Sequence, residues 1–309
     1  MTTPRIGAAA RTIVLSSRPL SWINTAYPFA VAYLLSTGRI DAFWLIGTVF
    51  FLVPYNLLMY GINDVYDYES DLRNPRKGGA EGALLDPSLH RPTIVAGVLS
   101  STPLLIAMLW LVPTPAAWVT LAVSVFAVVA YSLPPMRTKE RPVLDSITSS
   151  THFVSPGVYG AIAAGAEWNL PLVAIMLAFF AWGMAAHAFG AVQDVLPDRE
   201  ANISSIATRF GAAATTRFAI ALWSFAALAL VAAAASLSQV TPFSAGLLAL
   251  ASPLPLLYVA AVWQFRSVSD RDSPAANRAW KRFLVLNFIT GAAVSMLLIA
   301  WAMSGAAAF

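Results

Sequence analysis

Long apolar runs separated by short polar segments constrain this chain more than any other feature of its sequence. A helix that spans a bilayer needs about 20 mostly apolar residues. Of the 309 residues, 58% are hydrophobic and only 11% are charged, whereas a soluble domain carries roughly 25% charged residues. The sequence therefore predicts an all-α integral membrane protein that forms one transmembrane domain over residues 1–309. The nine predicted spans are 19–37, 42–64, 92–112, 116–133, 145–165, 169–195, 213–237, 242–265 and 281–304.

Proline residues lie inside several of the predicted spans. They are Pro54, Pro156, Pro253 and Pro255. Membrane helices tolerate such kinks where neighbouring groups satisfy the freed carbonyls. We therefore keep each of these runs as one span.

The distribution of basic residues predicts how the chain is oriented. With nine spans and a cytoplasmic N-terminus, eighteen of the nineteen Lys and Arg residues fall on the cytoplasmic side, and only Arg39 falls outside. This asymmetry is what fixes the orientation of membrane proteins. The first span follows Arg5, Arg11 and Arg18 and is expected to be an uncleaved helix, not a signal peptide. The prediction is a multi-pass protein of the cell membrane, with Phe309 outside and the chemistry on the cytoplasmic face.

Two simple counts exclude several kinds of function. The net charge of +4 is explained by the cytoplasmic cations of a membrane protein, so we expect no nucleic-acid partner. The chain has no cysteine, which excludes disulfides, thiolate metal sites and a cysteine nucleophile.

A cluster of acids follows the second span. If the helix continues to Asp71, the carboxylates of Asp64, Asp67 and Asp71 share one face. Carboxylates at a helix C-terminus repel one another and oppose the negative end of the helix dipole. A positive group must compensate them, and we interpret the cluster as one part of a metal site.

A second acidic pair follows the sixth span. Asp194 and Asp198 have i, i+4 spacing, with Pro197 between them. Proline disfavours a continuous helix here, so Asp198 is expected in a turn or in the first turn of a new helix. Carboxylates that converge from both motifs would suit Mg²⁺, which binds through few carboxylates plus substrate phosphates.

Basic residues are expected at the same depth as these acids. Arg73, Arg76 and Lys77 follow the first acidic motif, and Arg137 and Lys139 follow Pro134-Pro135 after the fourth span. The i, i+2 spacing of the latter pair predicts an extended loop that points both side chains in one direction. Arg suits bidentate phosphate contacts, and Lys supplies a point charge. Acids suited to bind a metal ion and bases suited to bind phosphate together indicate a diphosphate substrate. Contact with anionic lipid headgroups is the alternative explanation for the bases.

Three motifs together resemble the signature of the UbiA superfamily of membrane prenyltransferases. They are Asn63-Asp64-x-x-Asp67-x-x-x-Asp71, Tyr131-Ser132-x-Pro134-Pro135-x-Arg137-x-Lys139 and Asp194-x-x-x-Asp198. The resemblance implies nine transmembrane helices around a central cavity, open sideways to lipid, with two Mg²⁺ ions that grip a prenyl diphosphate. It also implies that Asn63 and Tyr131 contact the diphosphate. Asn202 departs from the superfamily pattern, in which an acid or a glycine often closes the second motif.

One branch of the superfamily is closer still. The segments Ser16–Pro28, Asn63–Gly82 and Lys139-Glu140-Arg141-Pro142 resemble the bacterial lycopene elongases of fifty-carbon carotenoid synthesis. This resemblance implies transfer of a dimethylallyl group from dimethylallyl diphosphate to each end of lycopene, which extends forty carbons to forty-five and then to fifty.

Three other functions stay open at this point. Within the same superfamily, the acceptor could be an aromatic quinone precursor, but we find no cationic anchor for an aromatic acid. An ion-coupled transporter would hold its acids near the bilayer midplane, whereas these acids follow the helix ends. A non-catalytic partner of a carotenoid cyclase is disfavoured by the complete set of five aspartates. The sequence leaves the oligomeric state open.

Overall fold

The computed structural model describes residues 6–72 and 84–304. All regular structure in these two ranges is helical, and no β-strand occurs in them. The chain forms two compact units. Unit 1 comprises Met1–Thr138 and Thr151–Gly165, and unit 2 comprises Lys139–Ser150 and Ala166–Phe309. The all-α prediction is confirmed for the described ranges. The prediction of one domain over residues 1–309 stays a prediction.

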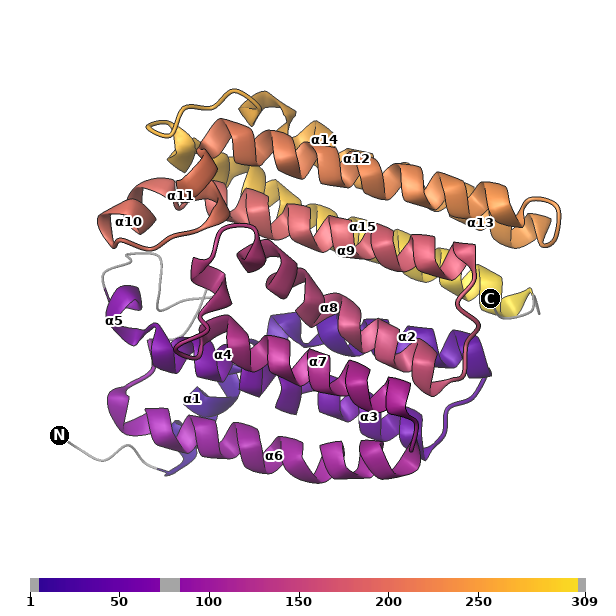
Figure 1. Cartoon of the computed structure of the whole chain (residues 1–309), viewed down its shortest axis with the longest axis horizontal. Helices are drawn as coiled ribbons and strands as arrows, with labels where there is room; N and C mark the ends of the chain where they lie inside the picture. Colours follow the sequence, from indigo (N-terminus) through magenta and orange to yellow (C-terminus); the bar gives the residue numbers. More distant parts are fainter. Residues whose placement is uncertain (1–5, 73–83, 305–309) are drawn as a thin grey trace. The chain divides into compact units, whose positions relative to one another are not determined.

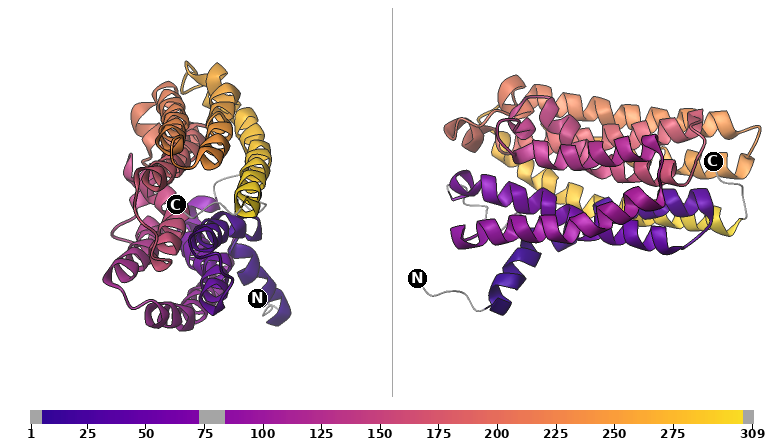
Figure 2. Two further views of the ribbon diagram at one scale, coloured as in Figure 1. Left: turned by 90° about the vertical axis from the view of Figure 1, so that its right-hand side faces the viewer. Right: turned by 60° about the horizontal axis from the view of Figure 1, so that its bottom comes forward.

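Unit 1 contains the helices of the first half of the chain (Figure 1). They are α1 (Ile6–Ser16), η1 (Pro19–Ser21), α2 (Trp22–Thr37), α3 (Ala42–Leu52), α4 (Pro54–Tyr66), α5 (Tyr68–Asp71), η2 (Pro87–Leu89), α6 (His90–Leu111), α7 (Pro115–Ser132) and the C-terminal part of α8 (Leu144–Ala163). The short α1, in indigo, lies at a steep angle to the longer helices of this unit in the right-hand view of Figure 2.

Unit 2 contains the remaining helices, of which α9 and α12 pack along one another (Figure 1). The unit begins with η3 (Thr138–Glu140) and the start of α8. Its other helices are α9 (Leu170–Val192), α10 (Val195–Glu200), α11 (Ile206–Phe210), α12 (Ala212–Leu237), α13 (Pro242–Ala251), α14 (Leu254–Val262), η4 (Trp263–Phe265), η5 (Ser273–Ala276) and α15 (Asn277–Met303).

Each unit has its own aromatic core. In unit 1, Phe29 packs against Phe51 and Tyr159, with ring centroids 5.2 Å and 6.1 Å away. In unit 2, the buried Trp223 stacks on Tyr258 at 5.5 Å. Aromatic pairs of this kind stabilise a core by about 0.5–1.5 kcal/mol beyond the area that they bury. These aromatic residues therefore serve packing within each unit.

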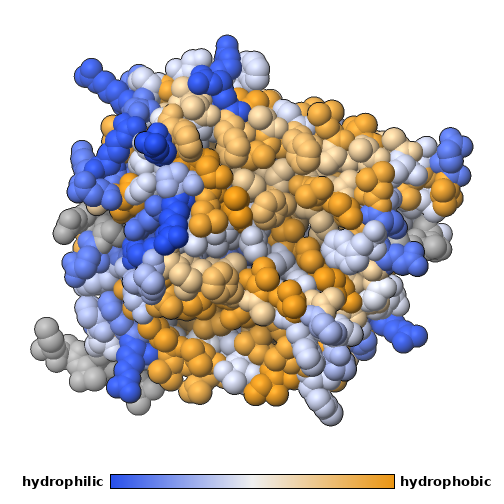
Figure 3. All heavy atoms as spheres, viewed as in Figure 1, coloured by the Kyte–Doolittle hydropathy of each residue, from blue (hydrophilic) through white to orange (hydrophobic). Residues whose placement is uncertain are grey.

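Seven helical segments of the described residues are long and apolar enough to cross a membrane. They are Ala42–Tyr66, Pro87–Leu111, Pro115–Ser132, Leu170–Val192, Ala212–Leu237, Pro242–Phe265 and Ser273–Met303. Hydrophobic residues follow the lengths of the helices on the face shown in Figure 3, and hydrophilic residues gather mainly near their ends. The chain is therefore a multi-pass membrane protein by helix length and composition.

The other two predicted spans form helices that do not meet the same limits. Helix α2 has only 16 residues. Helix α8 carries buried polar groups in its first half, among them Asp145, Ser150 and His152, which lower its mean hydropathy. The count of nine transmembrane helices therefore stays a prediction.

The interruption at Pro54 shows how a kinked span keeps its backbone satisfied. Helix α3 ends at Leu52, and Pro54 opens α4. The buried Asn56 Nδ2 donates to the carbonyls of Phe51 and Leu52 at 2.9 Å and 3.0 Å. Thr25 Oγ1 also donates to the Phe51 carbonyl at 2.6 Å. Buried carbonyls left without donors would cost free energy, so the neighbours of the kink supply donors, as the sequence led us to expect.

We predict that Asn56→Leu lowers the stability of the protein. Loss of the amide removes the side-chain donor of the Leu52 carbonyl and leaves the Phe51 carbonyl with Thr25 Oγ1 as its side-chain donor, which costs about 1–3 kcal/mol. Thr48→Val is the matched control, because Thr48 Oγ1 is buried without a hydrogen-bond partner among the described residues. Thermal unfolding in detergent should show a lower midpoint for Asn56→Leu than for the control. Equal midpoints would contradict this account of the kink.

Candidate active site

The first acidic motif lies where the second half of a kinked span ends. Helix α4 ends at Tyr66, Asp67 is its C-cap residue, and Tyr68–Asp71 forms the separate short helix α5. The condition that the helix continues to Asp71, under which the three acids would share one face, is therefore not met. A continued helix would place three carboxylates in its C-terminal turns, against the helix dipole. The break at Asp67 avoids that arrangement.

Asp64 is the buried acid of this motif, with 1% of its surface exposed. Arg18 Nη2 donates to Asp64 Oδ1 at 3.1 Å. The same guanidinium lies over the Tyr60 ring, 4.2 Å from its centroid. A buried carboxylate requires a partner of opposite charge, and Arg18 provides it in unit 1.

Local sequence places Arg18 where it can reach Asp64. Helix α1 stops at Ser16, and Arg18 N donates to the Leu15 carbonyl at 3.0 Å. Pro19 then opens η1. Arg18 has a φ of 52°, in the left-handed region, which costs a non-glycine residue about 1–2 kcal/mol. The ion pair and the ring contact are the interactions that offset this cost.

Asp67 has a looser partner of the same kind. Arg137 Nη2 lies 3.4 Å from Asp67 Oδ1, and the two side chains are 27% and 12% exposed. On the same helix as Asp64, Asn63 Oδ1 accepts a 3.0 Å hydrogen bond from the buried Ser132 of α7. The structure thus places Arg137 beside Asp67 and Ser132 beside Asn63, and the roles of these residues stay predictions.

The loop that carries Arg137 differs from its prediction. The N–H groups of Met136 and Arg137 both donate to the Leu133 carbonyl at 3.1 Å. Arg137 has a φ of 34°, and Lys139 follows in the short helix η3. The predicted extended loop is therefore wrong, because turn hydrogen bonds fold the segment. Arg137 belongs to unit 1 and Lys139 to unit 2.

Tyr131 is held within unit 1 by an aromatic contact. Its ring meets that of His152 at a centroid distance of 5.1 Å and an interplanar angle of 77°. Tyr131 directly precedes Ser132, whose hydroxyl binds Asn63. This contact fixes the end of α7 from which the Ser132 hydroxyl reaches α4.

The second acidic motif lies at a similar break, in unit 2. Helix α9 ends at Val192, Asp194 is the N-cap residue of α10, and Asp198 lies in the first turn of α10. Asp198 N donates to the Asp194 carbonyl at 2.9 Å. Pro197 is tolerated because the first turn of a helix needs no backbone donor there. Of the two predicted alternatives, a turn or the first turn of a new helix, the structure shows the second.

Asn202, which departs from the superfamily pattern, has a left-handed backbone. Its φ is 55°, and its N–H donates to the Arg199 carbonyl at 3.1 Å. Asn is one of the few non-glycine residues that adopt this region readily. The backbone at Asn202 is therefore one that asparagine tolerates.

Polar side chains of unit 2 hold the segment that carries Asp198. Asp270 accepts from Ala212 N at 2.7 Å and from Arg199 Nη2 at 2.7 Å. The pKa of Asp270 is lowered chiefly by the hydrogen bond from Ala212 N. Partial burial opposes this shift, and the nearby Arg199 adds to it. Asn277 donates to Gln193 Oε1 at the other end of the segment. The backbone around Asp194 and Asp198 is thus fixed by residues outside the motif.

Asp145 is a further buried acid that the motifs did not single out. Its carboxylate accepts from Ile206 N at 2.7 Å and from Ser146 N at 2.6 Å. His187 Nε2 lies 3.9 Å away. A lone acid at the start of a predicted apolar span is the signal that could have identified it. For Arg18 the available signal was its place within the Ser16–Pro28 resemblance.

The donor atoms suit a hard cation, although neither unit shows a complete set. Asn63, Asp64, Asp67, Asp194 and Asp198 offer the oxygen ligands that Mg²⁺ prefers. Among the described residues, no group of three or more His, Cys, Asp or Glu side chains is close enough to hold a metal ion. Asp71 ends α5, but its side chain lies outside the described part of the structure, as do the predicted phosphate ligands Arg73 and Lys77.

A family profile identifies the class of protein. Residues 25–289 match the UbiA prenyltransferase family. The chain belongs to this family, which confirms the resemblance carried by the three motifs and makes the protein a prenyltransferase.

Individual relatives show which members of the family this chain resembles. The chain is 48% identical to the lycopene elongase/hydratase of Corynebacterium glutamicum over 290 residues, which cover 94% of this chain and 97% of the relative. It is 50% identical to the C(50) beta-cyclic carotenoids biosynthesis protein LbtBC of Dietzia sp. (strain CQ4) over 288 residues. That match covers 93% of this chain and 64% of the length of LbtBC. The predicted likeness to lycopene elongases is therefore confirmed.

Solved structures show the same fold. A UbiA homolog from Archaeoglobus fulgidus, bound to GPP and Mg²⁺, matches with a TM-score of 0.69 and 18% identity, over 93% of this chain and 99% of that one. The same homolog bound to DMAPP and Mg²⁺ matches with a TM-score of 0.67, 19% identity and coverage of 92% and 99%.

We predict that Asp64→Asn and Arg18→Gln each lower stability in metal-free detergent. Either change leaves a charge without its partner, and the buried pair should show a coupling of about 1–3 kcal/mol in a double-mutant cycle. Asp67→Asn is the matched control, because its ion pair is longer and more exposed. Thermal unfolding of the wild type, Asp64→Asn, Arg18→Gln and the double variant measures the coupling. An Asp64→Asn protein as stable as the Asp67→Asn protein would contradict the proposed importance of the buried pair.

Proposed function

We propose that this protein transfers dimethylallyl groups from dimethylallyl diphosphate to both ends of lycopene, giving forty-five- and then fifty-carbon carotenoids. The observation that carries the proposal is 48% identity, over 94% of the chain, to a lycopene elongase/hydratase. The DMAPP and Mg²⁺ bound by the structural relative from Archaeoglobus fulgidus support the choice of donor and metal.

The two acidic motifs are the proposed metal ligands. Asp64, Asp67, Asp194 and Asp198 would hold Mg²⁺, and Asp71 is the fifth ligand that the sequence predicts. Bound Mg²⁺ would stabilise the negative charge of the departing diphosphate as a Lewis acid. Asp64 and Asp67 already lie beside guanidinium groups, so the position of each carboxylate is fixed by a polar partner.

Basic and polar groups are the proposed diphosphate ligands. Arg137 and Lys139, together with Arg73 and Lys77, would neutralise its oxygens, and Asn63 and Tyr131 would orient it. Support for Arg137 comes from its place beside Asp67, where a guanidinium can bind two oxygens at once. The Ser132–Asn63 hydrogen bond orients the Asn63 amide.

The chemistry follows from the donor and the acceptor. The bond between the allylic carbon and the diphosphate oxygen breaks, and the diphosphate leaves with the electron pair. A terminal double bond of lycopene attacks the allylic cation and forms a new carbon–carbon bond. The resulting tertiary cation ends by losing a proton or by taking up water. Lycopene dissolves in the bilayer, so an enzyme with apolar helices can meet this acceptor there.

The proposed topology follows the basic residues. Nine transmembrane helices around a central cavity, with a cytoplasmic N-terminus and an outer C-terminus, put eighteen of nineteen Lys and Arg residues on the cytoplasmic side. Both acidic motifs then lie on that side, where the water-soluble donor is made available.

The alternatives are less well supported. Membership of a prenyltransferase family argues against an ion-coupled transporter. An aromatic quinone precursor remains the competing acceptor within the family, but both relatives described above are carotenoid proteins by name.

We predict that the chain converts lycopene to longer carotenoids in a bacterial host engineered to make lycopene. Pigments separated by mass should contain one and two added five-carbon units, and an added water distinguishes hydration from deprotonation. Asp67→Asn and Asp194→Asn should lower the yield by at least about 100-fold, because a metal-assisted step loses several kcal/mol when a ligand is removed. Glu200→Gln, an exposed change in the same short helix as Asp198, should keep activity.

Unaltered lycopene, with well-expressed protein and ample dimethylallyl diphosphate, would contradict the proposed acceptor. Prenylation of an aromatic acid by the same membranes would support the quinone-precursor alternative. Full activity of Asp67→Asn or Asp194→Asn would remove that residue from the proposed site.

A further inference from the structure

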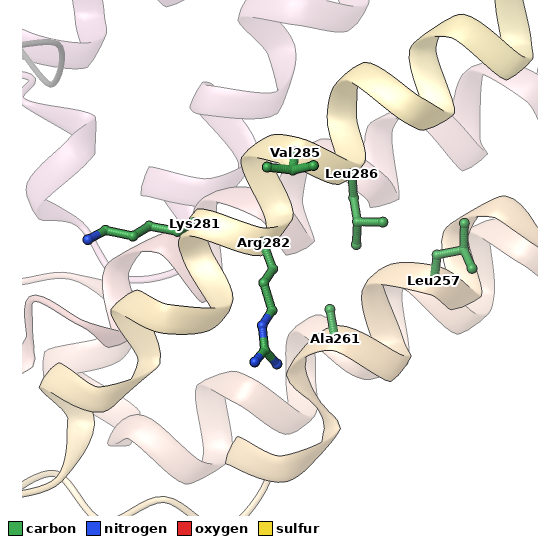
Figure 4. A pocket seen from close by; sticks show the side chains of 6 residues that line it. All are labelled: Leu257, Ala261, Lys281, Arg282, Val285 and Leu286. Atoms are coloured by element: carbon green, nitrogen blue, oxygen red, sulfur yellow. The ribbon is translucent and has the colours of Figure 1, made fainter.

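A groove of about 570 Å³ lies in unit 2 between α14 and α15. It is lined by Leu257, Ala261, Lys281, Arg282, Val285 and Leu286. Figure 4 shows Arg282 extending from α15 towards α14, whereas Lys281 points away from α14. The apolar side chains follow farther along the two helices (Figure 4). The groove therefore has a cationic end and an apolar body.

The positive charges at this end of α15 have no acid beside them on the same helix. Arg278, Lys281 and Arg282 lie in the first six residues of the helix, and α15 contains no acid. Cations at a helix N-terminus oppose the positive end of the helix dipole. Within the described ranges, neither Lys281 nor Arg282 forms an ion pair or a side-chain hydrogen bond with the protein. Both are exposed, so an external anion can reach them.

The apolar body of the groove is open as well. Leu257 is 41% exposed and Val285 is 59% exposed. Both residues lie in segments long and apolar enough to cross a membrane, where exposed apolar side chains meet acyl chains. A ligand that matches the whole groove needs a negative group at one end and a hydrocarbon chain along the rest.

We propose that this groove binds one anionic phospholipid. Its phosphate pairs with Arg282, and Lys281 adds positive charge nearby. One acyl chain lies along Ala261, Leu257 and Leu286. Basic pockets between membrane helices are suited to anionic headgroups. A free phosphate lacks the chain that the apolar body would bury, and a zwitterionic lipid lacks the net charge.

The test uses the purified full chain in neutral detergent. Binding of dioleoyl phosphatidylglycerol is compared with binding of two controls. Dioleoyl phosphatidylcholine has the same acyl chains but no net charge, and glycerol phosphate has no acyl chain. Native mass spectrometry counts bound lipid. We expect one phosphatidylglycerol to be retained in preference to phosphatidylcholine, and no retention of glycerol phosphate. Arg282→Gln should weaken retention about fivefold, the effect of roughly one cation near an anionic surface.

Matched variants distinguish lipid binding in the groove from nonspecific attraction of the lipid to positive charge. Arg271→Gln removes the same charge from the exposed loop between η4 and η5, outside the groove, and should leave retention unchanged. Ala261→Phe keeps every charge but fills the groove, and should also weaken retention, so the proposal can be tested even if Arg282→Gln does not fold. Equal losses in Arg271→Gln and Arg282→Gln, no effect of Ala261→Phe, or no preference between the two lipids would each overturn the proposal.

Discussion

The contact between Arg18 and Asp64 is the interaction on which the first motif depends. A carboxylate that is 1% exposed, near the end of a helix in an apolar protein, is costly unless an opposite charge accompanies it. Arg18 reaches it at 3.1 Å from a left-handed backbone between α1 and η1. The short N-terminal helix is thereby tied to α4, and the acid keeps a defined position before any ligand arrives.

Helix breaks set where the two motifs present their acids. Asp67 lies at the break between α4 and α5, and Asp194 at the break between α9 and α10. Polar side chains from neighbouring helices bind beside each break: Ser132 donates to Asn63 in unit 1, and Asn277 donates to Gln193 in unit 2. A break releases carboxylates from the regular helical register, and the neighbouring hydrogen bonds fix their new positions. Removing one of these supporting residues should therefore disturb a motif without changing its acids.

Much of the helical layout could be predicted from the apolar runs, because burial in lipid demands long helices with satisfied backbones. The three motifs were likewise readable from residue type and spacing. The break at Asp67 and the turn at Arg137 could not be read in this way. The turn at Arg137 forms through hydrogen bonds to the Leu133 carbonyl, and the contact between Asp67 and Arg137 joins residues 70 apart in the sequence; residue spacing reveals neither. A lone acid at the start of a predicted apolar span could have singled out Asp145, but its partner Ile206 N is a backbone group that residue type does not identify.

The central proposal is that each acidic motif is needed for Mg²⁺-dependent binding of the donor diphosphate. The most direct measurement is calorimetric binding of a non-ionising thiolo analogue of dimethylallyl diphosphate to the purified protein, with and without Mg²⁺. We expect one analogue to bind per chain in the presence of Mg²⁺ and none to bind in the presence of a chelator. Asp64→Asn and Asp194→Asn should each bind the analogue at least about tenfold more weakly, because each variant loses one charged ligand. An affinity for the analogue that is the same with and without Mg²⁺, or that is unchanged in either variant, would contradict this proposal.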